Sequence, residues 1–309
     1  MHIGLSIPQY GRFADPELAA EVSASAELIG YDSLWVGDRL LVAAAPRSRY
    51  PGGDGTAPAE QQVFLDPLTI LTVAATATSR VRLGSSALNA LWQPPVLLAR
   101  TLTTLDRVSG GRLDVGLGLG WSRDEYQAAG VPWAGRGARL EETLDVLERV
   151  WAEGDLVEHQ GAVWTVPPSV VRPKPVQRPR PPLLLGGFSA ATLARVGRRA
   201  DGWLGAALPV PVLRQMWRSV QQHAEQAGRD PEALRLVVRV NPVLTAEPAP
   251  ENQVPQRGTF GQLLGYLTHL VGALGAELLV DLHYAAGDAE EYLALAGDLH
   301  DALRKEAGR

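Results

Sequence analysis

Short apolar segments alternate with longer amphipathic segments from one end of this chain to the other. The alternation predicts eight strand–helix units, from a strand at 3–8 and a helix at 16–29 to a strand at 277–283 and a helix at 289–305. Parallel strands are covered by helices on both faces, which explains nearly continuous apolar runs such as LLVDL. Because a closed parallel barrel requires eight such units, we expect an α/β fold, a (β/α)8 TIM barrel in which residues 1–309 form a single domain. An open, doubly wound sheet is the structural alternative.

The units between these ends follow the same pattern. The remaining strands are expected at 33–37, 81–88, 113–119, 182–185, 202–206 and 234–244. The remaining helices are expected at 66–79, 94–109, 122–129, 136–152, 190–199, 211–227 and 260–274.

Two segments interrupt the alternation. Residues 39–63 follow the second strand and are rich in glycine, proline and serine, which indicates a long irregular loop. A long strand-to-helix loop lies at the catalytic face of a barrel, so we interpret it as a lid. Residues 157–181, an insertion after the fifth helix, contain a predicted hairpin around Gln160–Gly161 and then a proline-stiffened connector. The basic side chains of the connector are interpreted as solvated, with contact to an anionic ligand tail as the alternative.

Composition restricts the classes of partner. The net charge of −5 gives no reason to expect a nucleic-acid partner. The stretch 263–276 is too short to span a bilayer, and the N-terminus lacks the basic region of a signal peptide, so we expect no membrane partner. The chain has no cysteine, which excludes disulfides and fits a cytoplasmic location. Its six histidines show no metal-ligand spacing, so we expect no metal site.

Several stretches resemble, in unchanged order, those of the luciferase-like monooxygenase superfamily. They are LSIPQYG at 5–11, GYDSLWVGD at 30–38, DPLTILTVAATATSRVRLGSSAL at 66–88, PPVLLARTLTTLDRVSGGRLDVGLGLGW at 94–121, PKPVQ at 173–177, LLLGGFSAATLARVGRRADGW at 183–203 and GRDPEALRLVVRV at 228–240. The set is most similar to the F420-dependent oxidoreductases of that superfamily. The resemblance implies coenzyme F420 as the cofactor, with flavin mononucleotide (FMN) as the alternative, and a homodimer.

The turn Gly186-Gly187-Phe188-Ser189 joins the fifth strand to the sixth helix. Glycines let the backbone approach an anion, and the start of a helix offers free N–H groups. The resemblance implies that these four residues bind the cofactor phosphate. A tight turn in which Ser189 caps the helix is the alternative.

The third strand ends in small residues. The resemblance implies a bulge with a cis peptide bond between Ser86 and Ala87 that supports the ring of the cofactor, with Ser85 and Asn89 beside it. An ordinary strand end with small core residues is the alternative. Trp121, after the fourth strand, is interpreted as part of the cofactor pocket, with packing under the barrel rim as the alternative.

The chain departs from its apparent relatives at three positions. Bacterial luciferases have a phosphate-binding arginine where this chain has Leu119, which counts against FMN. Some F420 enzymes have a carboxylate where this chain has Trp121. Many relatives have Asp-His where this chain has Asp38-Arg39, and arginine cannot act as a general base. We interpret Arg39 as a clamp for an anionic substrate or a partner of Asp38, and both residues as catalytic candidates.

His283 is the remaining candidate for proton exchange. It ends the last predicted strand, at the edge where barrel enzymes carry their catalytic residues. A solvated strand-end histidine is the alternative. Tyr10, Trp92 and Asn241 also stand at strand ends and are expected to contact substrate.

These features predict an F420-dependent oxidoreductase that transfers a hydride between C5 of the deazaflavin and an organic small molecule. One alternative is an FMN-dependent two-component monooxygenase that uses reduced flavin and O2. Another is a non-catalytic protein that binds F420 or flavin.

Overall fold

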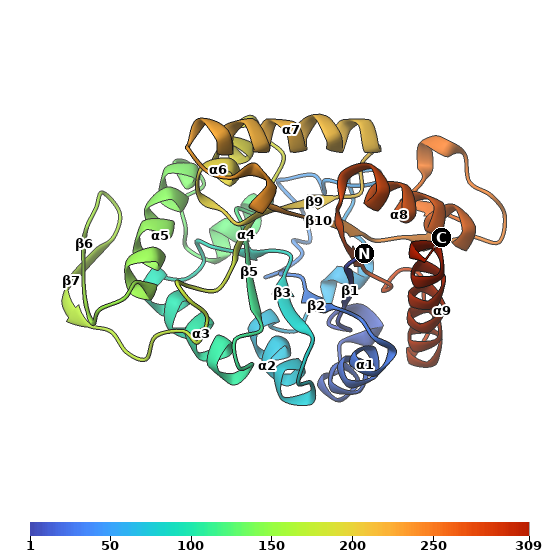
Figure 1. The fold of residues 1–309 in the computed structure, drawn as a ribbon, viewed down its shortest axis with the longest axis horizontal. Coiled ribbons are helices and arrows are strands. Elements are labelled where there is room, and N and C mark those ends of the chain that lie inside the picture. The colour runs from blue at the N-terminus through green and yellow to red at the C-terminus, as the bar shows by residue number, and fades with distance from the viewer. Residues whose placement is uncertain (309) are drawn as a thin grey trace.

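Parallel strands form the centre of the computed structural model, which describes residues 1–308 (Figure 1). The barrel strands are β1 (Ile3–Ser6), β2 (Ser33–Val36), β3 (Arg82–Ser85), β4 (Leu88–Asn89), β5 (Leu113–Gly118), β8 (Leu183–Gly186), β9 (Gly202–Ala206), β10 (Arg235–Val240) and β13 (Glu277–Val280). Neighbours pair in the order β3-β2-β1-β13-β10-β9-β8-β5, and β3 also pairs with β5, which closes the ring. The short β4 continues the position of β3 beside β5. The predicted eight-stranded TIM barrel is confirmed.

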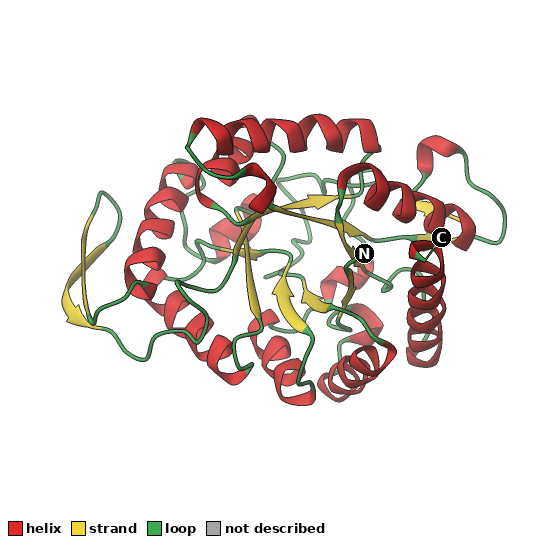
Figure 2. Cartoon of the chain, viewed as in Figure 1, coloured by secondary structure: helices red, strands yellow, loops and turns green. Residues whose placement is uncertain are grey.

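Helices surround the barrel (Figure 2). They are α1 (Pro16–Ile29), α2 (Pro67–Ala77), α3 (Pro95–Val108), α4 (Arg123–Ala128), α5 (Arg136–Trp151), α6 (Ala190–Arg199), α7 (Val210–Gln226), α8 (Phe260–Leu274) and α9 (Ala289–Ala307), with 3-10 turns η1 (Gly11–Phe13), η2 (Ala59–Gln62), η3 (Pro231–Ala233) and η4 (Glu251–Gln253). Local sequence sets their ends. In α1, for example, Asp15 caps the amide of Glu17 at 2.7 Å, Pro16 is the first residue, and Gly30 ends the helix at a φ of 112°. None of the helices within residues 1–308 is long and apolar enough to cross a membrane.

The barrel interior is filled, and its amino end is closed by charges. Trp35, Leu204 and Leu279 belong to the apolar cluster inside the ring. The Trp35 ring fits because β3 has Gly84 opposite it, where a Cβ atom would overlap the indole. At the amino end, the fully buried Asp114 carboxylate of β5 accepts hydrogen bonds from the guanidinium groups of Arg82 on β3 and Arg235 on β10. Only the carboxyl end of the barrel can therefore hold a ligand.

The predicted insertion is an antiparallel hairpin, β6 (Leu156–Gln160) and β7 (Thr165–Val170), which projects away from the barrel in Figure 1. The connector behind it runs along the amino ends of the strands. Its Lys174 donates to the carbonyl of Val150 at 2.7 Å, and Gln177 donates to the carbonyl of Leu113, the first residue of β5, at 2.7 Å. The alternative in which this connector touches a ligand tail at the catalytic face is therefore wrong.

Three strands end at least three residues earlier than predicted. β3 is interrupted before β4, and β13 stops at Val280. β10 stops at Val240 because Pro242 has no N–H to donate to a sheet. The chain then forms β11 (Val243–Leu244), which pairs with β12 (Arg257–Gly258) outside the barrel. At all three places the chain leaves the ring at its carboxyl end.

Candidate active site

Small residues form the floor of the barrel mouth. The Ser85 hydroxyl donates to the Gly116 carbonyl at 2.8 Å and accepts its N–H at 3.0 Å, so a side chain joins β3 to β5 where the strand breaks. The next peptide bond, Ser86–Ala87, is cis, as the resemblance implied. A Cβ atom on Gly118 or Gly186 would lie 3.5 or 3.6 Å from the Ala87 methyl group. Ala87, Gly118 and Gly186 therefore lie close together as a partly exposed surface of small residues.

The turn after β8 adjoins this floor. Gly187 has a φ of 134°, which side-chain-bearing residues rarely adopt. Its carbonyl accepts a hydrogen bond from the Trp203 indole at 2.9 Å, which fixes the turn on the barrel wall. Ser189 caps α6 through the amide of Thr192 at 3.2 Å, which is the alternative that the sequence left open for this turn. Phe188 is 47% exposed, and the amides of the two α6 residues before Thr192 have no acceptor within the helix.

An arginine that the sequence reasoning missed lies beside the cis peptide. Arg239 of β10 donates to the carbonyl of Ser86 at 2.7 Å and to the side-chain oxygen of Asn241 at 3.1 Å. It also forms an ion pair with Asp281, whose side chain is fully buried. Burial alone would raise the pKa of the Asp281 carboxyl, but the contact with His283 and the charge of Arg239 hold that pKa well below its usual range.

The carboxylate of Asp281 also contacts His283 and Tyr10. Nδ1 of His283 lies 2.5 Å from one Asp281 oxygen, and the Tyr10 hydroxyl donates to the other at 3.1 Å. The two rings stack with centroids 3.7 Å apart. Nε2 of His283 accepts the amide N–H of Gln9 at 3.0 Å, so both ring nitrogens are engaged inside the protein. Proton exchange by His283 and substrate contact by Tyr10 stay predictions; the geometry shows both side chains holding Asp281.

Asp38 follows β2, which is separated from β13 by β1 alone. Its carboxylate accepts the amide N–H of Asn89 at 2.9 Å. Burial, helped by the negative charges of Glu125 and Asp66, raises the pKa of Asp38 to about 7 despite this hydrogen bond. Asn89 in turn donates to the carbonyl of Leu119 at 3.2 Å, so it connects the ends of three strands. A carboxyl group with such a pKa is suited to exchange protons at neutral pH.

Arg39 turns toward a different part of the mouth. Its guanidinium lies 4.5 Å above the ring of Trp121, and its Nε is 3.7 Å from Oε1 of Glu125. The carboxylate of Glu125 also accepts the amide N–H of Leu40 at 2.8 Å, and burial raises the pKa of this carboxyl. Only 7% of the Arg39 side chain is exposed, and Nε has no hydrogen-bond partner within residues 1–308.

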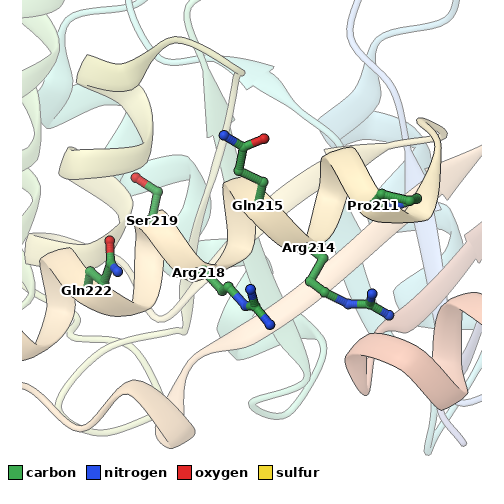
Figure 3. Close-up of a pocket in the computed structure, with 6 residues that line it drawn as sticks. All are labelled: Pro211, Arg214, Gln215, Arg218, Ser219 and Gln222. Carbon is green, nitrogen blue, oxygen red and sulfur yellow. The ribbon is translucent and has the colours of Figure 1, made fainter.

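A cavity of about 480 Å³ opens beside Arg39, under the long loop after β2. Arg39, Val42, Pro46, Tyr50, Trp121 and Asp124 are among the residues that line it. This arrangement agrees with the interpretation of residues 39–63 as a lid. A second cavity, of about 470 Å³, is lined by six residues that all come from α7, and Figure 3 shows them spread along that one helix. No residue at the barrel mouth contributes to it.

Trp92 is not joined to these groups. Its indole N–H is buried without a hydrogen-bond partner within residues 1–308, and it is absent from the walls of both cavities. Its contact with substrate stays a prediction.

Arg239 could have been found from the sequence, because it lies two and four residues after Val237 and Arg235 and so faces the barrel interior with them. Within the described part of the chain, no cluster of three or more His, Cys, Asp or Glu is placed to hold a metal ion.

Comparison with known proteins places this architecture. Residues 4–263 match the family described as luciferase-like monooxygenase. The chain belongs to this family. An uncharacterized protein of Mycobacterium tuberculosis is 31% identical over 79% of this chain and 85% of its own length.

Two solved structures share the fold. The monooxygenase RslO1 from Streptomyces bottropensis has a TM-score of 0.78 at 20% identity and covers 99% of this chain and 100% of its own. An F420-dependent secondary alcohol dehydrogenase in complex with an F420–acetone adduct has a TM-score of 0.75 at 17% identity, covering 98% of this chain and 99% of its own.

Proposed function

We propose that this member of the luciferase-like monooxygenase family is an F420-dependent oxidoreductase acting on an organic small molecule. The observation that carries the proposal is the floor of small residues formed by Ala87, Gly118 and Gly186 beside the first amides of α6. A flat ring fits over such a surface, and an anion fits at the start of a helix. Residues 186–189 would hold the phosphate, and residues 85–87 with Asn89 and Trp121 would surround the ring.

Position 119 favours F420 over FMN. The resemblance places the phosphate-binding arginine of luciferases there, whereas this chain has a leucine whose carbonyl accepts hydrogen bonds from Asn89 at 3.2 Å and Tyr126 at 2.5 Å. The solved neighbour that is an F420-dependent alcohol dehydrogenase supports this choice. The neighbour that is a monooxygenase has the same fold, and for this reason an FMN-dependent monooxygenase is the second candidate.

When bound, the deazaflavin supplies or accepts a hydride at C5. The chain must then exchange one proton with the substrate. Asp38 performs this exchange, because a carboxyl group with a pKa of about 7 is protonated in about half of the molecules at neutral pH. In the reducing direction the Asp38 carboxyl donates its proton and takes another from solvent. Reduction should therefore slow as the pH rises above about 7, and oxidation should slow as it falls below.

Titration of the purified apo-protein with F420 and, separately, with FMN tests the choice of cofactor. We expect F420 to bind at least about a hundredfold more tightly, equivalent to about 2.7 kcal/mol. Tight FMN binding without F420 binding would overturn the proposal, and oxygen-dependent turnover with a flavin reductase would then select the monooxygenase. F420 binding without turnover of any alcohol, ketone or unsaturated acid would select a non-catalytic carrier. We also propose a homodimer, to be measured by light scattering.

A further inference from the structure

The cavity under residues 39–62 contains a guanidinium that the protein itself does not satisfy. Within residues 1–308, its polar and ring partners are the Glu125 carboxylate, 3.7 Å from Nε, and the Trp121 ring. An arginine carries five N–H donors, and leaving them without acceptors when buried costs free energy. The Arg39 side chain is 93% buried and lines the cavity, so an acceptor from outside the protein can reach it there.

The neighbouring carboxylates do not take this role. Oε1 of Glu125, the oxygen nearest Arg39, accepts the amide N–H groups of Leu40 at 2.8 Å and Leu41 at 3.4 Å, so this oxygen is occupied in holding the start of the loop. Asp124 also lines the cavity, and its charge opposes an anion, but it accepts the amide N–H of Arg47 at 2.9 Å. Within residues 1–308 the Arg39 Nε–H has no hydrogen-bond acceptor, and a guanidinium pairs well with a planar acceptor that has two oxygens.

The rest of the cavity wall is mixed, because polar side chains such as Ser48, Gln62 and Ser122 stand beside apolar and aromatic ones. Val42, Pro46 and two aromatic rings, Tyr50 and Trp121, line it, and these rings meet edge to face with centroids 5.4 Å apart. A volume of about 480 Å³ is in the range of cavities that enclose small organic ligands. The Arg39 guanidinium and this pair of aromatic rings together favour a molecule with a negatively charged end and an apolar, flat body.

We propose that this cavity is the substrate site and that its ligand is a small carboxylic acid with an apolar, unsaturated body, its carboxylate on Arg39 and its body against Tyr50 and Trp121. That the bound acid is the substrate rests on the oxidoreductase function proposed above. Binding of the acid itself is independent of that function, because no residue of the turn 186–189 lines the cavity.

Calorimetric titration of the apo-protein with cinnamate and with cinnamamide tests the inference. The two probes share a shape and differ in charge. We expect cinnamate to bind about ten- to a hundredfold more tightly, the ratio for hydrogen bonds to a charged group. Arg39→Met should abolish this preference, and Arg39→Lys, which keeps the charge and loses the paired donors, should retain part of it. Arg136→Met is the matched control, because Arg136 also stacks on a tryptophan, 3.7 Å from the ring centroid of Trp133, and lies outside the cavity.

Equal binding of the two probes would overturn the inference, as would failure of both to bind at about 10 mM. An unchanged preference in a folded Arg39→Met protein would do the same, and Arg39→Lys provides the comparison if the methionine variant unfolds. Cofactor titrations of the same samples keep the two proposals apart. Loss of F420 binding with cinnamate binding intact would refute the proposed function and leave the acid site standing.

Discussion

Replacing Asp38 with asparagine should make the protein more stable and less active. The wild-type carboxylate accepts one amide N–H from Asn89 but is otherwise held in a buried place that disfavours its charge. The pKa difference between 3.8 and about 7 corresponds to about 4 kcal/mol at pH 8, at 1.36 kcal/mol per pKa unit. Because the side chain retains some contact with solvent, which screens part of this cost, we expect a gain of about 1–3 kcal/mol.

The upward shift of the Asp38 pKa on folding fixes the sign with which stability depends on pH. The folded protein binds the Asp38 proton more tightly than the unfolded chain, so wild-type stability falls as the pH rises from about 3.8 to about 7. The variant lacks this loss. Its advantage is therefore largest above pH 7 and disappears toward pH 4.

Urea unfolding at pH 5 and pH 8.5 measures this difference. The unfolding free energy of the variant should exceed that of wild type at pH 8.5, and by a smaller margin at pH 5. Asp298→Asn, an exposed carboxylate on α9, is the control and should change little. An Asp38→Asn protein that is no more stable than wild type at pH 8.5 refutes the burial argument. One that keeps full turnover refutes the assigned proton exchange.

Three other substitutions test residues that support the barrel and the proposed cofactor site. Arg239→Met removes the ion-pair partner of the buried Asp281, so unfolding should become easier by about 3–5 kcal/mol; a change below about 1 kcal/mol in urea unfolding would contradict this. Gly84→Ala places a methyl group against Trp35, and calorimetry should show a loss of about 1–3 kcal/mol in the free energy of unfolding. An unchanged unfolding free energy would mean that the barrel expands at this position. Gly187→Ala forces a side chain onto a φ of 134°, and titration should show cofactor affinity falling about tenfold or more; unchanged affinity would exclude this turn from the phosphate site.

Some parts of the site could be predicted because they depend on neighbours in the chain. The cap at Ser189 and the helix that starts at Pro16 each follow from two or three adjacent residues. The cis bond after Ser86 was predicted only by resemblance. The strand break beside it was likewise expected only as the bulge that the resemblance implies, because an apolar run by itself does not indicate where a strand leaves the barrel.

The residues that were missed depend on partners distant in sequence. The role of Arg239 depends on its ion pair with Asp281, 42 positions later, and on its hydrogen bond to the carbonyl of Ser86, 153 positions earlier. Alternation along one strand gives the face of a side chain and says nothing of what meets it. The burial of His283 between other aromatic rings was hidden for the same reason, since the prediction placed it only at a strand end.

The sequence alone determined the repeated strand–helix unit, the barrel that eight such units close, and the family to which the barrel belongs. The first two depend on periodicity and on contacts between near neighbours, whereas the family was indicated by the resemblance of the ordered motifs. The tertiary structure decided the pKa of Asp38, which burial and then the charge of Glu125 raise, and the cavity beside Arg39, whose guanidinium lies near the same Glu125. Glu125 is 85 positions from the Leu40 amide that it holds, so neither effect could be predicted from near neighbours in the chain. Electrostatic energy depends on distance in space and on exclusion of water, and neither is defined until the chain has folded.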